Sequence, residues 1–180
     1  PRIFQDMGMG NPMVQTVIMG VVNISFTLVA VFTVEKLGRK PLLILGSIGM
    51  AVGALGVALT FGNAALSTVT MISIMVYSAS FMFSWGPIAW VLIAELFPNT
   101  IRGAAVAIAV AFQWIFNFIV SSTFVPMFNM HLTPGDDFGH WFTYGLYGVI
   151  CILAAIFVWK LVPETKGKTL EDMSKLWRKE

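Results

Sequence analysis

One apolar stretch of this sequence carries a regular stripe of polar side chains. Within residues 101–124, Gln113, Asn117 and Ser121 recur every four residues and therefore share one face of a helix. An amide in hydrocarbon is costly unless it has a partner, so this face must meet protein or water. Because an amide both donates and accepts hydrogen bonds, we favour a polar cavity that binds a hydroxylated ligand. A hydrogen-bonded seam between helices is the alternative.

A second polar face lies near the amino terminus. Thr16, Asn23 and Thr27 are spaced seven and four residues apart, which places them on one side of a helix. A lone asparagine in a membrane helix commonly makes a hydrogen bond to a neighbouring helix, worth about 0.6 kcal/mol. With two polar companions, Asn23 is equally consistent with the lining of a cavity, and the residues alone leave both readings open.

A break in an apolar helix is the third feature. The stretch from Ser84 to Arg102 reads SWGPIAWVLIAELFPNTIR and contains the pair Gly86 and Pro87. Proline lacks the N–H of a helical hydrogen bond and clashes with the carbonyl four residues earlier. In lipid, such a break is tolerated only where the freed backbone groups face protein or a water-filled cavity. Trp90 follows one turn later, so we predict that its ring lines a binding site. A kinked packing helix is the alternative.

The sequence offers no candidate for metal, cofactor or acid–base chemistry. His131 and His140 lie in a loop without cysteines or spaced carboxylates, so we expect them to be solvated. There is no phosphate-binding or dinucleotide-binding glycine pattern, and no carboxylate lies near the centre of an apolar stretch. The basic residues flank apolar stretches and do not imply nucleic acid. We therefore expect neither an enzyme nor a bound cofactor.

The elements that position these residues are membrane-spanning helices. Hydrophobic residues make up 57% of the chain and charged residues 11%, against about 25% charged residues in soluble domains. Five apolar runs have the roughly 20 residues that cross about 30 Å of hydrocarbon. We place them at 13–34, 41–62, 67–95, 101–124 and 141–162. The predicted fold is an all-α membrane protein with five transmembrane helices.

Charge asymmetry between the loops predicts the orientation of these helices. Ten of the eleven Lys and Arg lie in three segments that alternate with the others, around 35–41, 95–103 and after 159. The only charged residues in the opposite loops are Arg2 and three aspartates. By the positive-inside rule, the first group is cytoplasmic. We therefore expect the amino-terminal end of this chain outside and its carboxy-terminal end inside.

Two of the runs have features of packing and of lipid contact. The run 41–62 carries glycines that allow close helix approach, and we interpret this face as a packing surface. These glycines are Gly46, Gly49, Gly53 and Gly56. The run 141–162 has aromatic residues toward both ends and is interpreted as lipid-facing scaffold. Residues 163–180 follow as a cytoplasmic tail with a short amphipathic helix.

Five short motifs occur in an order and spacing that resemble one family. They are EKLGRK at 35–40, the broken helix with PIAW and ELFP, IRG at 101–103, QW at 113–114 and PETKG at 163–167. Together they resemble the sugar porter branch of the major facilitator superfamily, in particular the bacterial D-xylose–proton symporters. The resemblance extends over essentially the whole chain.

This resemblance implies a place within a twelve-span transporter of the bacterial inner membrane. Residues 1–162 correspond to spans eight to twelve of the carboxy-terminal six-helix half, and 163–180 to the cytoplasmic tail. The amino-terminal half and the seventh span are expected in a longer protein, of which this chain is read as a fragment. The implied activity is monosaccharide transport by alternating access, of xylose or glucose type, coupled to protons. A facilitative uniporter of a sugar or polyol, or a non-transporting sugar sensor, is the alternative.

The resemblance also implies roles for particular residues. Sugar hydrogen bonding falls on Asn23, Trp90 and Gln113, and Trp114 flanks the pocket. A second set belongs to the cytoplasmic charge network that, in this family, holds the two halves together in the outward-facing state. Its members here are Glu35, Arg39, Glu95, Arg102 and Glu164. Of these, Glu95 is the expected partner of Arg102. The proton-coupling residue of the family's symporters lies in the first span, outside this sequence.

Overall fold

The computed structural model describes residues 12–97, 99–132 and 137–167, and every regular element in these ranges is a helix. The helices are α2 (Pro12–Leu37), α3 (Arg39–Thr60), α4 (Ser67–Phe83), α5 (Trp85–Leu96), α6 (Asn99–Phe128) and α7 (Phe138–Leu161), with a 3₁₀ turn η1 (Ala64–Leu66) before α4. Five segments are long and apolar enough to cross a membrane, α4 and α5 together forming one of them. The prediction of an all-α membrane protein with five spans is confirmed.

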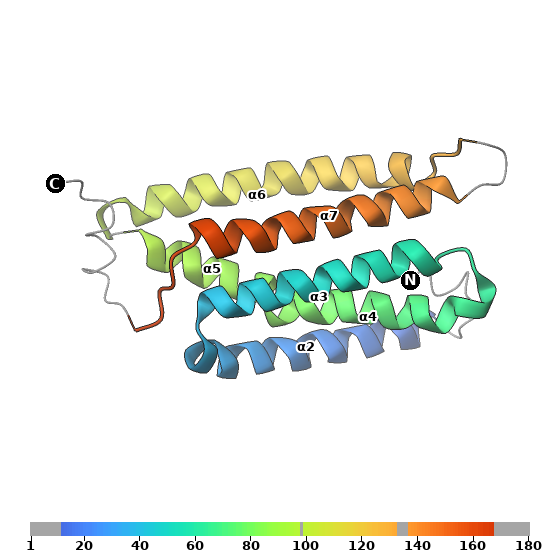
Figure 1. The fold of residues 1–180 in the computed structure, drawn as a ribbon. Coiled ribbons are helices and arrows are strands. Elements are labelled where there is room, and N and C mark those ends of the chain that lie inside the picture. Colours follow the sequence, from blue (N-terminus) through green and yellow to red (C-terminus); the bar gives the residue numbers. More distant parts are fainter. Residues whose placement is uncertain (1–11, 98, 133–136, 168–180) are drawn as a thin grey trace.

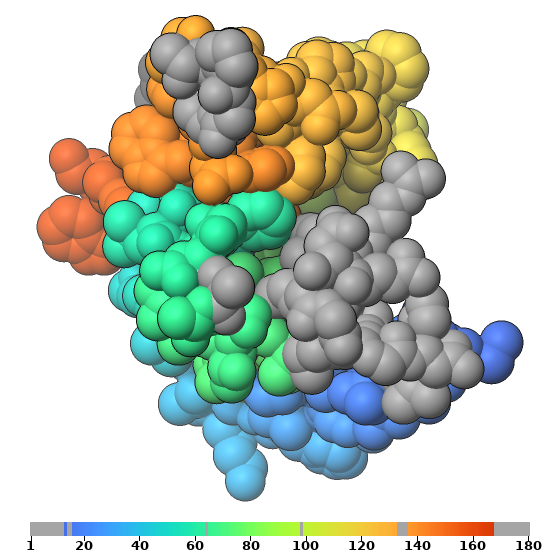
Figure 2. All heavy atoms as spheres, turned by 90° about the vertical axis from the view of Figure 1, so that its right-hand side faces the viewer, coloured from blue at the N-terminus to red at the C-terminus, as the bar shows by residue number. Residues whose placement is uncertain are grey.

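Consecutive spans run in opposite directions, so their connections collect at two ends of the bundle (Figure 1). We call the end with residues 36–40, 94–102 and 162–167 the charged end. The opposite end, where α3 and α6 finish and α7 begins, is called the aromatic end. Figure 2 looks onto the aromatic end, with the orange and gold atoms of α6 and α7 on one side of the α3 and α4 ends and the blue atoms of α2 on the other.

Helix α3 packs against α4 through the glycine face predicted from the sequence. A Cβ atom on Gly53 would lie 2.7 Å from the Ser73 carbonyl oxygen and 2.7 Å from the Tyr77 nitrogen, both in the α4 backbone. The glycines before and after it likewise face serines of α4 or of its end. These pairs are Gly46 with Ser84, Gly49 with Ser80 and Gly56 with Ser73. Since no side chain separates the two helices, their backbones approach closely, and the predicted packing face is confirmed.

Helix α7 packs along α3 as well, which corrects one prediction. Thr143, Cys151 and Val158 on α7 are buried, and a Cβ on Gly148 would lie 2.8 Å from the Leu55 side chain of α3. The interpretation of 141–162 as lipid-facing scaffold is wrong for this face. The apolar composition of α7 concealed it, because helix-facing and lipid-facing residues in a membrane are equally hydrophobic.

The break in the third span lies at Ser84, between α4 and α5, two residues before the predicted Gly86 and Pro87. Ser84 has φ −130° and ψ −82°, and its N–H bonds to the Phe81 carbonyl instead of continuing the α-helical pattern. Pro87 is the third residue of α5, where a helix leaves its N–H groups unpaired in any case. The proline ring excludes a helical carbonyl four residues back, at Phe83, so the distortion falls before the proline.

Helix α6 stands apart from the rest of the bundle. None of its residues is buried by the described parts of the chain, and every residue from 111 to 123 is exposed. The polar stripe of Gln113, Asn117 and Ser121 lies in this exposed stretch. Within the described ranges, Gln113 and Asn117 are therefore left uncovered, whereas Ser121 at the end of the stripe borders a cavity shared with α3, α4 and α7.

Candidate functional site

Two helices and the segment after α7 meet through polar side chains at the charged end. The Arg39 guanidinium at the start of α3 lies 2.6 Å from the Glu95 carboxylate near the end of α5. The other oxygen of Glu95 accepts a hydrogen bond of 2.6 Å from the Thr165 hydroxyl, which is nearly completely buried. One carboxylate thus joins α3, α5 and the segment that follows α7.

Glu164 binds the amino terminus of α3. Its carboxylate accepts hydrogen bonds from the backbone N–H groups of Arg39 at 3.0 Å, Lys40 at 3.1 Å and Lys166 at 2.9 Å. Partial burial alone raises the pKa of this carboxyl. The backbone hydrogen bonds of Lys166, Arg39, Lys40 and Thr165 together outweigh burial, so the pKa of Glu164 lies below its ordinary value. A carboxylate at a helix amino terminus is also favoured by the helix dipole.

Gly38 makes room for this interaction. It lies between α2 and α3 with φ 94° and ψ 168°, a backbone conformation that side chains with a Cβ rarely adopt. A Cβ here would also lie 2.7 Å from a carboxylate oxygen of Glu164. Nearby, the Lys166 ammonium donates a 2.5 Å hydrogen bond to the Lys36 carbonyl at the end of α2. The turn between α2 and α3 is therefore held on two sides by residues 164–166.

The structure does not bring all five predicted charged residues together. Glu35 is exposed on α2 and makes no ion pair with any described residue. Arg102, for which the sequence suggested Glu95 as partner, instead donates from Nε to the Phe97 carbonyl at 3.3 Å. Its Nη2 is buried and has no hydrogen-bond partner among the described residues. The predicted Arg102–Glu95 pair is absent because Glu95 is already occupied by Arg39 and Thr165.

Asn23 is half-buried on α2 and contacts α4. Its side-chain oxygen accepts a 3.3 Å hydrogen bond from the Ser78 hydroxyl, and its backbone carbonyl accepts one of 2.8 Å from Thr27. This is the interhelical contact that the sequence left open as one of two readings. The hydrogen bond from Ser78 uses the amide oxygen of Asn23. Among the described residues, none is recorded as accepting a hydrogen bond from the amide nitrogen.

The other three predicted ligand-binding residues lie on two further helices. Trp90 is on α5 and its side chain is 42% exposed. Gln113 and Trp114 are on α6, both exposed, and Trp114 is 67% exposed. None of these four residues lines the cavity of about 570 Å³ between α3, α4, α6 and α7 or the groove of about 580 Å³ between α5 and α7. They are polar or aromatic groups on faces that the described residues leave open.

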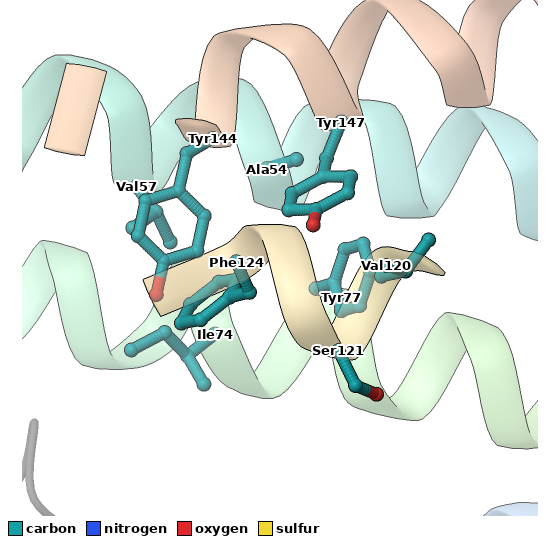
Figure 3. Close-up of a pocket in the computed structure, with 9 residues that line it drawn as sticks. All are labelled: Ala54, Val57, Ile74, Tyr77, Val120, Ser121, Phe124, Tyr144 and Tyr147. Carbon is teal, nitrogen blue, oxygen red and sulfur yellow. The ribbon is translucent and has the colours of Figure 1, made fainter. Parts of the chain in front are cut away.

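A cavity of about 570 Å³ lies toward the aromatic end, between α3, α4, α6 and α7. Figure 3 shows Tyr144 and Tyr147 projecting from α7 toward Phe124 of α6, with Tyr77 contributed by α4. The Phe124 ring is stacked on Tyr147 at 6.2 Å and edge-on to Tyr144 at 6.4 Å between centroids. Ser121, the last residue of the α6 polar stripe, also lines this cavity.

Several contacts were not predicted from the sequence. The Trp85 indole N–H donates a 2.7 Å hydrogen bond to the Ser47 hydroxyl. No motif or spacing in the sequence connects these two residues. His140, expected to be solvated, is instead packed between the rings of Phe61 at 4.4 Å and Phe128 at 4.1 Å. Its Nδ1 lies 3.3 Å from an Asp137 oxygen. Within the described ranges, no cluster of three His, Cys, Asp or Glu side chains could hold a metal ion.

Comparison with known proteins places this fold and its charged motifs in one family. A family model described as sugar (and other) transporter matches residues 1–177. The D-xylose-proton symporter of Escherichia coli (strain K12) is 47% identical over 182 positions, which cover 100% of this chain and 37% of that protein. The arabinose-proton symporter of Bacillus subtilis (strain 168) is 40% identical, covering 99% and 38%. The glucose facilitated diffusion protein of Zymomonas mobilis is 38% identical, covering 99% and 38%.

Solved structures agree with this assignment. A double tryptophan mutant of XylE matches with a TM-score of 0.88 and 47% identity, covering 98% of this chain and 37% of that one. The major facilitator superfamily proton:xylose symporter XylE bound to 6-bromo-6-deoxy-D-glucose matches with a TM-score of 0.82 and 49% identity, covering 92% and 35%. The five-span bundle is thus a multi-pass membrane segment of the major facilitator fold. The chain belongs to the sugar transporter family, whose members named above are transporters and not enzymes, and it spans just over a third of their length.

Proposed function

We propose that this chain is the carboxy-terminal part of a monosaccharide transporter that works by alternating access. The observation that carries the proposal is the 47% identity with a D-xylose-proton symporter along the whole chain, together with a matching fold. In this proposal the chain supplies spans eight to twelve, and the amino-terminal half and seventh span belong to the complete protein. A midplane site between two halves explains why the predicted ligand-binding residues lie on uncovered faces here.

The proposed sugar site consists of Asn23, Trp90 and Gln113, with Trp114 at its edge. A pyranose would place its apolar C–H face against an aromatic ring while amides bond its hydroxyls, since small-molecule sites combine apolar walls with few polar groups. The 42% exposure of Trp90 leaves part of its ring open to a ligand. The exposed amide of Gln113 and the partly exposed amide of Asn23 would bond hydroxyl groups of the sugar.

The charged end is proposed as a releasable contact with the other half of the transporter, formed by Glu35, Arg39, Glu95, Arg102 and Glu164. Arg39 and Glu95 keep 17% and 29% of their side-chain surface exposed, so water can solvate both charges when their ion pair opens in the transport cycle. The buried, unpaired Nη2 of Arg102 supports this role. A buried donor without a partner is costly, which favours an acceptor supplied by the rest of the complete protein.

The proposed location is a bacterial inner membrane, with the charged end cytoplasmic and the aromatic end outside. The basic residues at the charged end support this orientation through the positive-inside rule. Residues 1–162 would form the membrane domain and 163–180 a cytoplasmic tail. The amphipathic helix expected in this tail lies outside the described residues. Of the tail, 163–167 are described, and they pack on the charged end through Glu164 and Thr165.

Proton-coupled symport is the proposed transport mode. The D-xylose-proton and arabinose-proton symporters among the relatives support it, whereas the relative named a glucose facilitated diffusion protein represents the facilitative alternative. The described spans contain no central carboxylate that could relay a proton. Coupling would therefore depend on residues of the missing amino-terminal half.

Sugar binding to a Trp90→Ala variant of the complete protein tests the proposed site. Removing the ring should weaken xylose and glucose binding at least about tenfold, because an aromatic face contributes roughly 1.5 kcal/mol or more when buried by a ligand. Isothermal titration calorimetry measures this directly. Trp159→Ala is the matched control, since Trp159 is an exposed tryptophan of α7 outside the proposed sugar site, and this variant should bind as the parent does. Unchanged affinity in Trp90→Ala would remove this residue from the site.

A further inference from the structure

A partly buried hydrogen bond joins α3 to the first residue of α5. The Trp85 indole N–H donates to the Ser47 hydroxyl oxygen at 2.7 Å, and that hydroxyl donates to the Leu43 carbonyl at 2.8 Å. Ser47 is fully buried. The donor and acceptors in this short chain of hydrogen bonds are therefore satisfied, and the Ser47 hydroxyl at its centre is shielded from water.

This hydrogen bond lies directly beside the helix break. On the α4 side, Ser84 is in close contact with Gly46 of α3, so the end of α4 is held by backbone packing. On the α5 side, the regular α-helical hydrogen bonds start again only with the Ile88 N–H bonding to the Ser84 carbonyl at 2.9 Å. The backbone between the two helices is thus free of the regular ladder, and the start of α5 is held to α3 by Trp85.

The remaining contacts of α5 restrict its rotation less strongly. Ile88 and Leu92 pack against Leu42 and Leu43 of α3, but apolar packing is non-directional. Along its other side, α5 borders a groove of about 580 Å³ that it shares with α7. At the far end, the partly exposed Arg39–Glu95 pair is the second polar connection to α3. A hydrogen bond requires a defined angle and distance, so Trp85 selects one rotational setting of α5.

We propose that Trp85 and Ser47 are a positioning pair that sets the rotation of α5, and with it the direction of the Trp90 ring. Trp90 follows Trp85 by five residues on the same short rigid helix, so a change at one end redirects the other. Opening of the Trp85–Ser47 hydrogen bond accompanies movement of α5 about Ser84. The part of this inference that concerns Trp90 rests on the proposed function, because that function makes Trp90 a sugar ligand.

The test is a double-mutant cycle of Ser47→Ala and Trp85→Phe in the complete protein. Both variants carry Ile93→Cys as a reporter on the groove side of α5, in a Cys151→Ser background. The rate of maleimide labelling at position 93 is measured without sugar, and xylose affinity is measured separately. Each single change should alter both quantities about threefold to tenfold, as expected for one hydrogen bond. The double variant should match the single ones, because the same interaction is removed only once.

Two further variants separate positioning from a general packing defect. Ser47→Thr keeps the hydroxyl and should retain the parent labelling rate. Ser73→Ala removes a serine on the same α3–α4 seam whose hydroxyl bonds only the Val69 carbonyl of its own helix, and it should change neither quantity. Trp85→Phe leaves Ser47 bonded to Leu43, so it tests the pair even if Ser47→Ala folds poorly.

The outcomes distinguish this inference from the proposed function. Parent-like labelling in both single variants, or additive effects in the double variant, would overturn the positioning pair. Equal defects in Ser47→Thr and Ser47→Ala would do the same. A parent protein that binds no sugar would contradict the proposed function instead, and the sugar-free labelling would still decide whether Trp85 and Ser47 set the rotation of α5.

Discussion

At the residue scale, Glu164 illustrates how one carboxylate organises the charged end. It accepts backbone hydrogen bonds from two residues at the start of α3 and from Lys166 beyond α7. The motif PETKG directed attention to this residue, and the resemblance assigned it to a charge network. The sequence does not tell which helix end lies beside residue 164. It therefore could not predict that the Glu164 carboxylate accepts hydrogen bonds from backbone N–H groups and not from basic side chains.

Glu164→Gln should lower stability by about 1 kcal/mol at pH 7, because a charged acceptor at a helix amino terminus is replaced by a neutral one in a partly exposed position. The lowered pKa of Glu164 determines the pH dependence. Its stabilisation is fully present above the unfolded-state pKa of about 4.3 and is lost as the pH falls through the lower folded-state value. Thermal melts in detergent at several pH values measure the difference.

The difference between parent and Glu164→Gln should therefore shrink as the solution is acidified below about pH 4. Lys160→Gln is the matched control, because Lys160 is exposed on α7, lies outside the proposed contact and stays charged at acidic pH. It should change stability little at any pH. A gap between parent and Glu164→Gln that stays constant down to acidic pH would show that the charge of Glu164 is not what stabilises this end.

The α6 stripe makes a second prediction at this scale. Gln113→Ala in the complete protein should weaken sugar binding by about 1–3 kcal/mol, because hydroxyl groups of the bound sugar lose a partner. Asn117→Ala should cost less, since Asn117 belongs to the stripe without direct contact to the ligand in this account. Equilibrium binding of xylose to the two variants gives their order. The reverse order would mean that a different face of α6 meets the sugar.

At the element scale, the α3–α4 glycine face makes a stability prediction. Gly53→Ala should destabilise the complete protein by about 1–3 kcal/mol, the usual cost of overpacking, because the new methyl group would meet the backbone of α4 at Ser73 and Tyr77. Gly145→Ala on α7 is the matched control, with no atom near the added methyl group. It should be neutral or slightly stabilising, since alanine favours helix. Equal melting temperatures of the two variants would contradict close α3–α4 contact.

The helices could be predicted from the length of the apolar runs and from the helix-breaking residues. How the helices pack against one another could be predicted less well. The run 67–95 corresponds to Ser67–Leu96, and the run 101–124 is extended to Phe128 because Pro126 does not end α6 in the structure. The break was predicted from Pro87 but occurs at Ser84, since a proline disturbs the turn before it. The pairing of Glu95 with Arg39 instead of Arg102 depends on tertiary packing that no local pattern encodes.

At the scale of the whole molecule, the distribution of burial is uneven. Helix α3 is largely buried, whereas α6 has no buried residue among those described, although it carries Gln113, Trp114 and the rest of its polar stripe. A polar stripe that faced lipid would be costly. We therefore expect the walls that cover α6 to come from the remainder of the complete transporter. Relatives of this family have such a remainder over the other two thirds of their length.

Uptake of labelled xylose and glucose into liposomes tests the central claim most directly. The complete protein and the chain 1–180 alone are reconstituted side by side, with insertion and orientation verified by protease protection of the charged end. The account predicts saturable uptake, competed by unlabelled sugar, with the complete protein only, because a midplane site requires walls from both halves. Saturable and competable uptake by chain 1–180 alone, or none by the complete protein, would contradict the account.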